Sequence, residues 1–259
     1  MSNAITDIIM KPEFFGKFYA IAERTTGRVQ RLGELPKYTV MTSNIPNLDL
    51  YGLRSRTSED ANFGELLEVG TIRKRPMIQQ IRDNNGNQTG SFVKFVYLAD
   101  SVKSKGKVDL TKIERAEEQY VKPNTGGGDI TDGCDFEQTF GDLLLLSATP
   151  VDEYLGGVKT GQIDHILVIT RSEQNDETYD IKVSNIDTAV LKKPMFTKLK
   201  MVNPTGRVFT DVSQVETGTI TVSLSADDLE EVKEVVTPKQ ESKPQAQAEQ
   251  PQNKSNGNK

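Results

Sequence analysis

Few residues of this chain have the types and spacing that catalysis needs. His165 is the single histidine, and no G-x-S-x-G motif precedes it as a nucleophile for a triad. Cys134 is the single cysteine and lacks the second cysteine or histidines of a zinc site. The stretch "TGGGD" at 125–129 lacks the Lys-Ser/Thr of a phosphate-binding loop, and "DITDGCDFE" lacks calcium-loop spacing. We therefore expect no catalytic residue, no cofactor and no metal.

A second kind of chemistry, the binding of single-stranded nucleic acid, needs aromatic rings interleaved with cations. Bases stack on rings for about 1–3 kcal/mol each, while Lys and Arg neutralise phosphates. The N-terminal half carries such a set: Lys17, Tyr19, Arg28, Arg31, Arg73, Lys74, Arg75, Phe92 and Lys94. The alternative is that the rings pack inside the protein and the cations are ordinary surface.

The elements that must position these residues occur twice. "TGSFVKFVYLAD" at 89–100 is echoed by "TGTITVSLSAD" at 217–227, and Phe15-Gly16 by Phe140-Gly141. "VMTS" from Val40 is echoed by "VITRS" from Val168, and Pro76 by Pro204. These landmarks keep one order and nearly one offset, which predicts an internal duplication.

Each predicted unit contains about five short, β-branched and aromatic runs bounded by Gly, Pro and Asn. We place the first unit at 13–103 and the second at 134–230. The pair Asn85-Gly86 predicts a hairpin in the first unit, and the alternation from Thr219 to Ser225 predicts a half-buried strand in the second. The expected fold is mainly β, with two similar small antiparallel β-barrels, of the oligonucleotide-binding (OB-like) type, in tandem. A β-sandwich is the rival fold.

The last strands of the two units differ on one face. Inward Ile220, Val222 and Leu224 correspond to Val93, Phe95 and Tyr97. The other face shows small hydroxyls in the second unit, but Phe92, Lys94 and Val96 in the first. We therefore expect the first unit to bind nucleic acid.

Two segments lie outside the units. Residues 104–133 are expected to be a linker, with a short helix in "TKIERAEEQYVK" and a flexible "PNTGGGDITDG". Residues 231–259, rich in Gln, Glu, Lys, Pro, Ser and Asn, form a predicted disordered C-terminal tail.

Charge and composition limit where the protein is located and what it binds. Residues 1–120 carry 18 Lys+Arg against 15 Asp+Glu, and the remainder carries 14 against 22. This asymmetry marks the first half for a polyanion or reflects chance variation between surfaces. A single cysteine, no basic leader and no long apolar run predict a cytoplasmic protein without a membrane segment.

The second unit resembles a small protein family of Gram-positive conjugative transposons. The resemblance rests on "FEQTFGDLLLL", "KLKMVNPTGRVF" and "TGTITVSLSADDL", covers most of 135–230 and is weaker over 13–103. The family includes helicase processivity factors, which help a helicase unwind element DNA. Its members are single-unit and short, whereas this chain has two units and a tail.

The resemblance and the cation set together predict a non-catalytic accessory protein for replication and conjugation of a mobile element. We expect it to bind single-stranded or forked DNA and to contact a helicase or relaxase through its acidic second unit or tail. The first alternative is a protein-binding scaffold of a transfer apparatus or phage without nucleic-acid affinity. The second is an enzyme of unfamiliar type.

Overall fold

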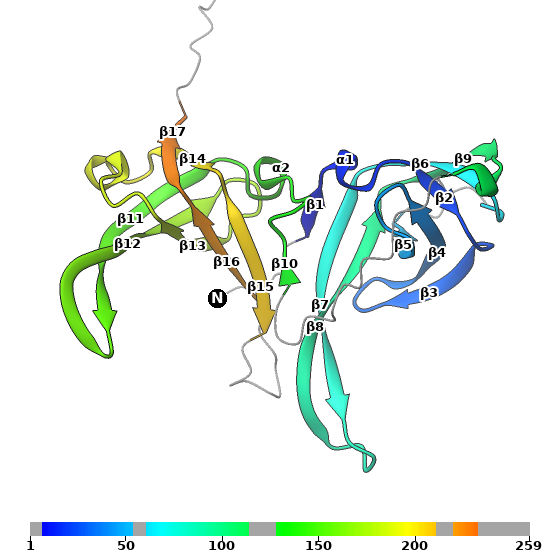
Figure 1. Ribbon diagram of the computed structural model, residues 1–259, viewed down its shortest axis with the longest axis horizontal. Helices are drawn as coiled ribbons and strands as arrows, with labels where there is room; N and C mark the ends of the chain where they lie inside the picture. The colour runs from blue at the N-terminus through cyan, green and yellow to red at the C-terminus, as the bar shows by residue number, and fades with distance from the viewer. Residues whose placement is uncertain (1–6, 54–60, 114–127, 211–219, 233–259) are drawn as a thin grey trace, which may run out of the picture.

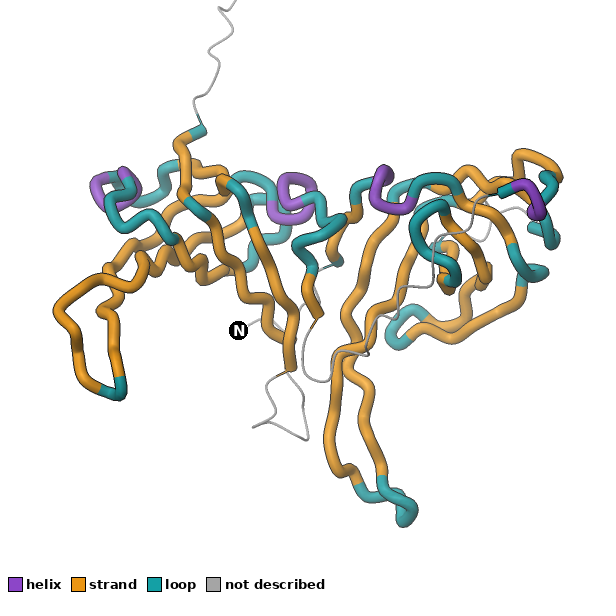
Figure 2. The backbone as a smooth tube through the Cα atoms, in the orientation of Figure 1, coloured by secondary structure: helices purple, strands orange, loops and turns teal. Residues whose placement is uncertain are grey.

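The protein is built from two β-sheets joined side by side (Figures 1 and 2). A computed structural model describes residues 7–53, 61–113, 128–210 and 220–232. The first sheet contains β1 (Ile8–Met10), β2 (Phe18–Ala20), β3 (Thr25–Val29), β4 (Gly33–Thr42), β5 (Leu48–Gly52), β6 (Glu65–Val69), β7 (Ile72–Arg82), β8 (Gln88–Ala99) and β9 (Val102–Lys107).

The second sheet follows from residue 128 onward. It contains β10 (Gly128–Asp129), β11 (Leu143–Leu155), β12 (Val158–Ser172), β13 (Thr178–Val183), β14 (Lys198–Val202), β15 (Thr205–Thr210), β16 (Ile220–Ala226) and β17 (Asp228–Glu231). Helical elements in the described residues are short: α1 (Pro12–Phe15), α2 (Phe136–Phe140) and the 3₁₀ turns Leu110–Lys112 and Ala189–Lys192. No described helix has the length and apolar character that crossing a membrane requires.

The two sheets have one strand order. The first runs β1-β7-β8-β5-β4-β2-β6-β9, and the second runs β10-β15-β16-β13-β12-β11-β14-β17. Substituting each strand by its counterpart converts one order into the other. Each sheet also contains one parallel pair, β5 with β8 and β13 with β16, which places Ala99 and Ala226 at matching positions.

Local details repeat along with the strand order. α1 and α2 each end in Phe-Gly, and the glycines Gly16 and Gly141 have φ of 72° and 63°, a region that favours glycine. The buried hydroxyls of Thr42 and Ser172 each accept hydrogen bonds from the backbone N–H groups two and three positions later. However, the match of Pro76 to Pro204 is wrong, because Pro76 lies inside β7 while Pro204 precedes β15.

Several sequence predictions are confirmed. The fold is mainly β. β7 and β8 form an antiparallel hairpin whose turn contains Gly86 at φ 84°. Within β16, Leu224 is buried while Thr221 and Ser223 are exposed, as the alternation requires.

The prediction of two small antiparallel barrels, closed or nearly closed, is not confirmed, because the described strands form no closed barrel and each sheet contains a parallel pair. β6 pairs with β2 and β9, whereas β7 pairs with β1 and β8. The consecutive strands β6 and β7 are therefore not hydrogen-bonded to each other, and we call the place where they separate the seam. On its other side β1 is hydrogen-bonded to the chain before α2: Lys11 N–H donates to Gly133 O, and Asp135 N–H to Ile9 O, both at 2.8 Å. The outer edge of β1, which would have to pair with another strand of the first sheet to close it, is thus hydrogen-bonded to the second half of the chain instead.

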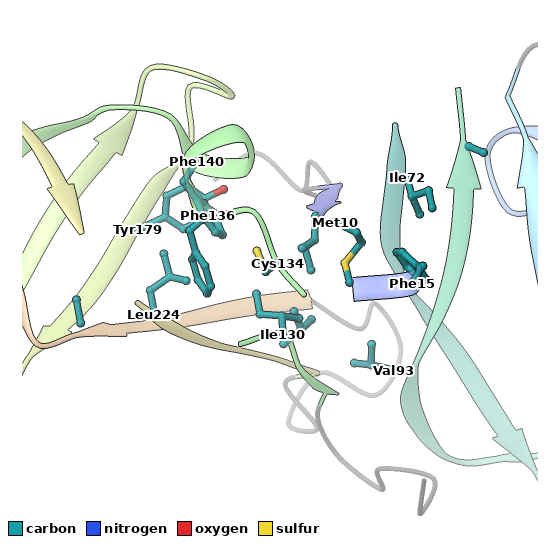
Figure 3. Packing of buried hydrophobic residues seen from close by; sticks show 14 of the residues in the cluster. Met10, Phe15, Ile72, Val93, Ile130, Cys134, Phe136, Phe140, Tyr179 and Leu224 are labelled. Atoms are coloured by element: carbon teal, nitrogen blue, oxygen red, sulfur yellow. The ribbon is translucent and has the colours of Figure 1, made fainter. Parts of the chain in front are cut away.

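A single cluster of buried apolar residues runs through both halves (Figure 3). Ile8 and Met10 of β1 continue into Ile130, Cys134 and Phe136 at the start of the second half. Two separate cores were implied by tandem barrels, so this expectation is corrected. Within the expected linker 104–133, residues 104–107 belong to β9, Gly128–Asp129 is a strand and Ile130 is buried.

Other sequence predictions lie partly or wholly outside the described residues. The expected short helix falls mostly in 114–127, and its described start is the 3₁₀ turn Leu110–Lys112. The expected tail lies outside them from residue 233 on, whereas Glu231 belongs to β17.

Candidate nucleic-acid interface

The hairpin of β7 and β8 carries five of the predicted binding residues. Its antiparallel register places Arg73 opposite Leu98, Arg75 opposite Val96, and Phe92 opposite Gln79. Arg73 and Gln79 are six positions apart on one strand, which at ~3.3 Å per residue is about 20 Å. The predicted residues therefore lie along a line and form no compact pocket.

Arg73 and Arg75 are held by carboxylates of the protein itself. Arg75 donates to both carboxylate oxygens of Asp7 at 2.6 Å, and the two side chains are only 18% and 19% exposed. Arg73 donates to Asp100 through Nε and Nη2, at 3.3 and 3.1 Å. Paired, partly buried guanidinium groups of this kind fasten β1 and the end of β8 to β7, and they offer little charge to a phosphate.

Lys74 points to the opposite face of β7 and is buried between the two sheets. Its Nζ donates to the carbonyl oxygen of Asp129 at 3.3 Å and lies 4.3 Å from the centre of the Phe95 ring. Burial lowers the pKa of this amine, and the nearby Asp129 carboxylate partly opposes that effect. Lys74 thus joins the halves of the molecule and is not available to a polyanion.

The face of β8 that was expected to be bare is partly covered. Val96 and Leu98 are buried in a small cluster with Val29, which belongs to the hairpin of β3 and β4. Met77, opposite Lys94, packs against the same cluster. The β3–β4 hairpin therefore lies over the β7–β8 face that sequence reasoning assigned to bases.

This packing puts the β3–β4 hairpin on the side of β7–β8 where Lys94 stands. Arg28 and Arg31, beside Val29, lie at the end of the β3–β4 hairpin, on the same side of β7–β8 as Lys94. All three side chains are exposed, and none forms an ion pair with a described residue. Arg31 has φ 67° in the turn, which keeps the hairpin tight. We call Arg28, Arg31 and Lys94 the hairpin cations.

Lys17 and Tyr19, the two predicted residues in or next to β2, have different environments. Tyr19 is 8% exposed and packs inside the protein, so its ring is not a stacking surface. Lys17 is exposed and lines a cavity of about 280 Å³ together with Phe18, Leu67, Ile72 and Lys105. This cavity lies at the seam between β6 and β7.

Sequence reasoning missed the projecting hairpin of β11 and β12. These strands extend beyond the sheet to a turn at Gly156 and Gly157, with φ of 60° and 84°. Tyr154, Leu155 and Val158 beside the turn are strongly exposed. The Gly-Gly pair between apolar residues was the available signal, because two-residue hairpin turns favour glycine.

The described residues contain no arrangement typical of catalysis or metal binding. His165 Nδ1 lies 2.6 Å from a carboxylate oxygen of its neighbour Asp164, and no hydroxyl or thiol nucleophile shares this contact. Burial raises the pKa of the Cys134 thiol to about 11, which keeps it protonated and unreactive. No described group of three or more His, Cys, Asp or Glu side chains could hold a metal ion. No protein-family model and no curated protein matches this chain.

Proposed function

We propose that this protein is a non-catalytic DNA-binding accessory protein of a mobile element, whose first half binds single-stranded or forked DNA while its second half contacts a helicase or relaxase. The observation that carries the proposal is that the hairpin cations are exposed on one side of β7–β8 and form no ion pair with a described residue. Cations that lack internal partners are free to neutralise phosphates and release counterions. The resemblance to conjugative-transposon proteins supplies the biological setting.

We further infer that the two halves arose by duplication of one unit. The shared strand order, the parallel pair in each sheet and the repeated Phe-Gly helix ends support this origin. After duplication the units diverged at one face of β8 and β16. Lys94 and Val96 of the first unit occupy the positions that Thr221 and Ser223, with small hydroxyl side chains, occupy in the second. This difference favours the first unit as the DNA-binding one.

Fluorescence anisotropy with a labelled oligonucleotide tests the DNA-binding proposal. A chain in which Arg28, Arg31 and Lys94 are all replaced by Ala should bind more weakly. Three lost phosphate contacts should also flatten the slope of log K against log salt by about 2. The control replaces three exposed lysines of the second half of the chain, Lys182 in β13, Lys200 in β14 and Lys192 in a 3₁₀ turn, and should change neither property.

Equal weakening by both triple variants would show that binding is diffuse and would refute the hairpin-cation site. Absence of any salt-dependent affinity in the wild-type chain would refute DNA binding itself.

The second candidate function is a protein-binding scaffold without affinity for nucleic acid. It is favoured by the exposed apolar tip of β11–β12, a type of surface that marks protein contacts. A purified chain without co-purified nucleic acid, seen as a low ratio of absorbance at 260 and 280 nm, together with no oligonucleotide binding, would favour the scaffold.

A further inference from the structure

The tip of the β11–β12 hairpin is an apolar surface that nothing described in the chain covers. Tyr154, Leu155 and Val158 are 62%, 77% and 70% exposed, and they surround the Gly156-Gly157 turn. Figures 1 and 2 show the hairpin reaching out at the free end of the second sheet, away from the first. Such strongly exposed neighbouring apolar groups indicate a contact site.

The corresponding hairpin of the first sheet shows why this tip is left uncovered. There β3–β4 folds back, and Val29 is buried against Val96 and Leu98 of β8. In the second sheet the matching strand, β16, shows exposed Thr221 and Ser223. Because hydroxyl groups give an apolar hairpin little to pack on, β11–β12 keeps its apolar tip in solvent.

The tip carries acidic groups at its base. Asp152 and Glu153 precede Tyr154, and Lys159 forms an ion pair with Asp152 at 2.6 Å. Glu153 accepts a hydrogen bond from the Thr160 hydroxyl at 2.9 Å, and no described cation pairs with it. The surface is thus apolar at its end and net acidic behind it.

The cavity at the β6–β7 seam has the complementary character. Its lining includes the buried apolar residues Phe18, Leu67 and Ile72, and its charged residues are Lys17, Lys105 and Glu68, a net charge of +1. Lys105 forms an ion pair with Glu68, whereas Lys17 forms none with a described residue. At about 280 Å³ the cavity can accept one or two aliphatic or aromatic side chains.

We propose that the hairpin tip of one copy of this chain docks into the seam cavity of a second copy. Leu155 and its apolar neighbours would cover the apolar lining, while Asp152 and Glu153 would face Lys17 and Lys105. A second copy is required because the tip and the seam lie on different sheets, and the β11–β12 hairpin projects away from the first sheet (Figure 1).

The cavity suits a protein side chain better than a nucleobase. Phe18 is its only aromatic residue and is 6% exposed, so the cavity offers little ring surface for a base to stack on. The proposal therefore does not depend on DNA binding.

The contact is heterologous, since the two copies use different surfaces. After two copies pair, one tip and one cavity of the pair remain free, on different copies, so association continues head to tail. A contact this small is weak by itself, and we expect assembly that grows with protein concentration.

Sedimentation velocity of the full chain, without DNA and from micromolar to near-millimolar concentration, tests the proposal. The wild-type sedimentation coefficient should rise with concentration. Leu155→Asp at the tip, or Lys17→Glu together with Lys105→Glu at the cavity, should each give a monomer at every concentration. Leu191→Asp, at an exposed position in the 3₁₀ turn Ala189–Lys192, is the matched control and should still assemble.

Mixing the two defective variants gives the decisive measurement. The Leu155→Asp chain retains its cavity and the cavity variant retains its tip, so the mixture should form a heterodimer and nothing larger. Far-UV circular dichroism checks that each variant is folded. A wild-type chain that stays monomeric, or oligomers that survive either variant, or a mixture that yields no heterodimer, would overturn the proposal.

Discussion

Replacing Ile130 by Ala tests whether the two sheets share one cooperative core. Ile130 is 1% exposed, follows β10 and lies in the buried cluster that links β1 to the second sheet. The substitution removes three carbon atoms from the core, which at about 0.8 kcal/mol each is about 2.4 kcal/mol of transfer free energy.

The cavity left behind adds to this cost. One close neighbour, Gly206, has no side chain that could move into the space, and a Cβ there would lie only 2.8 Å from Ile130 Cγ1. We therefore expect a total loss of about 3–4 kcal/mol in the free energy of unfolding.

Urea denaturation followed by far-UV circular dichroism and tyrosine fluorescence measures the loss. Hydrogen exchange with mass spectrometry then locates it, because peptides from β4 and from β12 report on different sheets. With one shared core, both sets of peptides should lose protection by the same amount. The control Ile163→Ala, at an exposed position, should change stability by less than about 0.5 kcal/mol.

Two separate unfolding transitions, with only the peptides of the second sheet affected by Ile130→Ala, would refute this reasoning. That outcome would mean that the apolar contact between the halves is not cooperative.

Three further predictions concern single side chains. Asp7→Asn should lower the free energy of unfolding by about 1–3 kcal/mol in urea titrations, because it leaves the partly buried Arg75 guanidinium without its carboxylate. Cys134 has a folded-state pKa of about 11 against an ordinary 9.0, so above pH 9 the unfolded chain loses a proton that the folded chain keeps. The contribution of this thiol to the free energy of unfolding should therefore fall between pH 9 and 11, by about 1 kcal/mol at pH 10. In urea titrations at those pH values, the difference in free energy of unfolding between wild type and Cys134→Ala should shrink. Phe196 is 63% exposed at φ 66°, where the first sheet has Gly64, so Phe196→Asn should raise the thermal midpoint through about 0.5–1 kcal/mol of relieved backbone strain.

Each of these predictions has a control. Asp49→Asn removes an exposed partner of Lys37 and should cost less than about 1 kcal/mol, so an equal cost would contradict the role given to Asp7. A difference between wild type and Cys134→Ala that does not change with pH would rule out linkage through that thiol. Leu191→Asn, at a position without positive φ, should not stabilise the chain, and destabilisation by Phe196→Asn would show that its side chain has a packing role.

Local patterns in the sequence predicted local structure well. Asn85-Gly86 marked a hairpin because its turn needs positive φ, and the alternation in β16 marked its buried face because side chains of a strand point to opposite sides. The Phe-Gly pairs indicated the repeat, but the short helices that end at them were not predicted from the sequence. These signals depend on neighbouring residues only, so no knowledge of distant contacts was required.

The candidate site depended on contacts between residues far apart in the chain, and there the sequence was insufficient. Arg75 was expected to meet phosphate, but it meets Asp7, which is 68 positions away and reaches it only because β1 pairs with β7. Lys74 was expected on the same surface, but strand alternation turns it toward the second sheet. Arg28 and Arg31 share a side of β7–β8 with Lys94 only because the β3–β4 hairpin packs over β8.

The sequence alone determined a mainly β chain with a repeated pattern, since these features follow from side-chain type and spacing. Tertiary contacts decided that the sheets stay open and share one core. They also decided that Arg73 and Arg75 pair with carboxylates of the protein and that Lys74 is buried. The physical reason is that sheet closure, burial and ion pairing depend on which strand edges and faces come into contact. Those contacts are between residues that are far apart in the sequence.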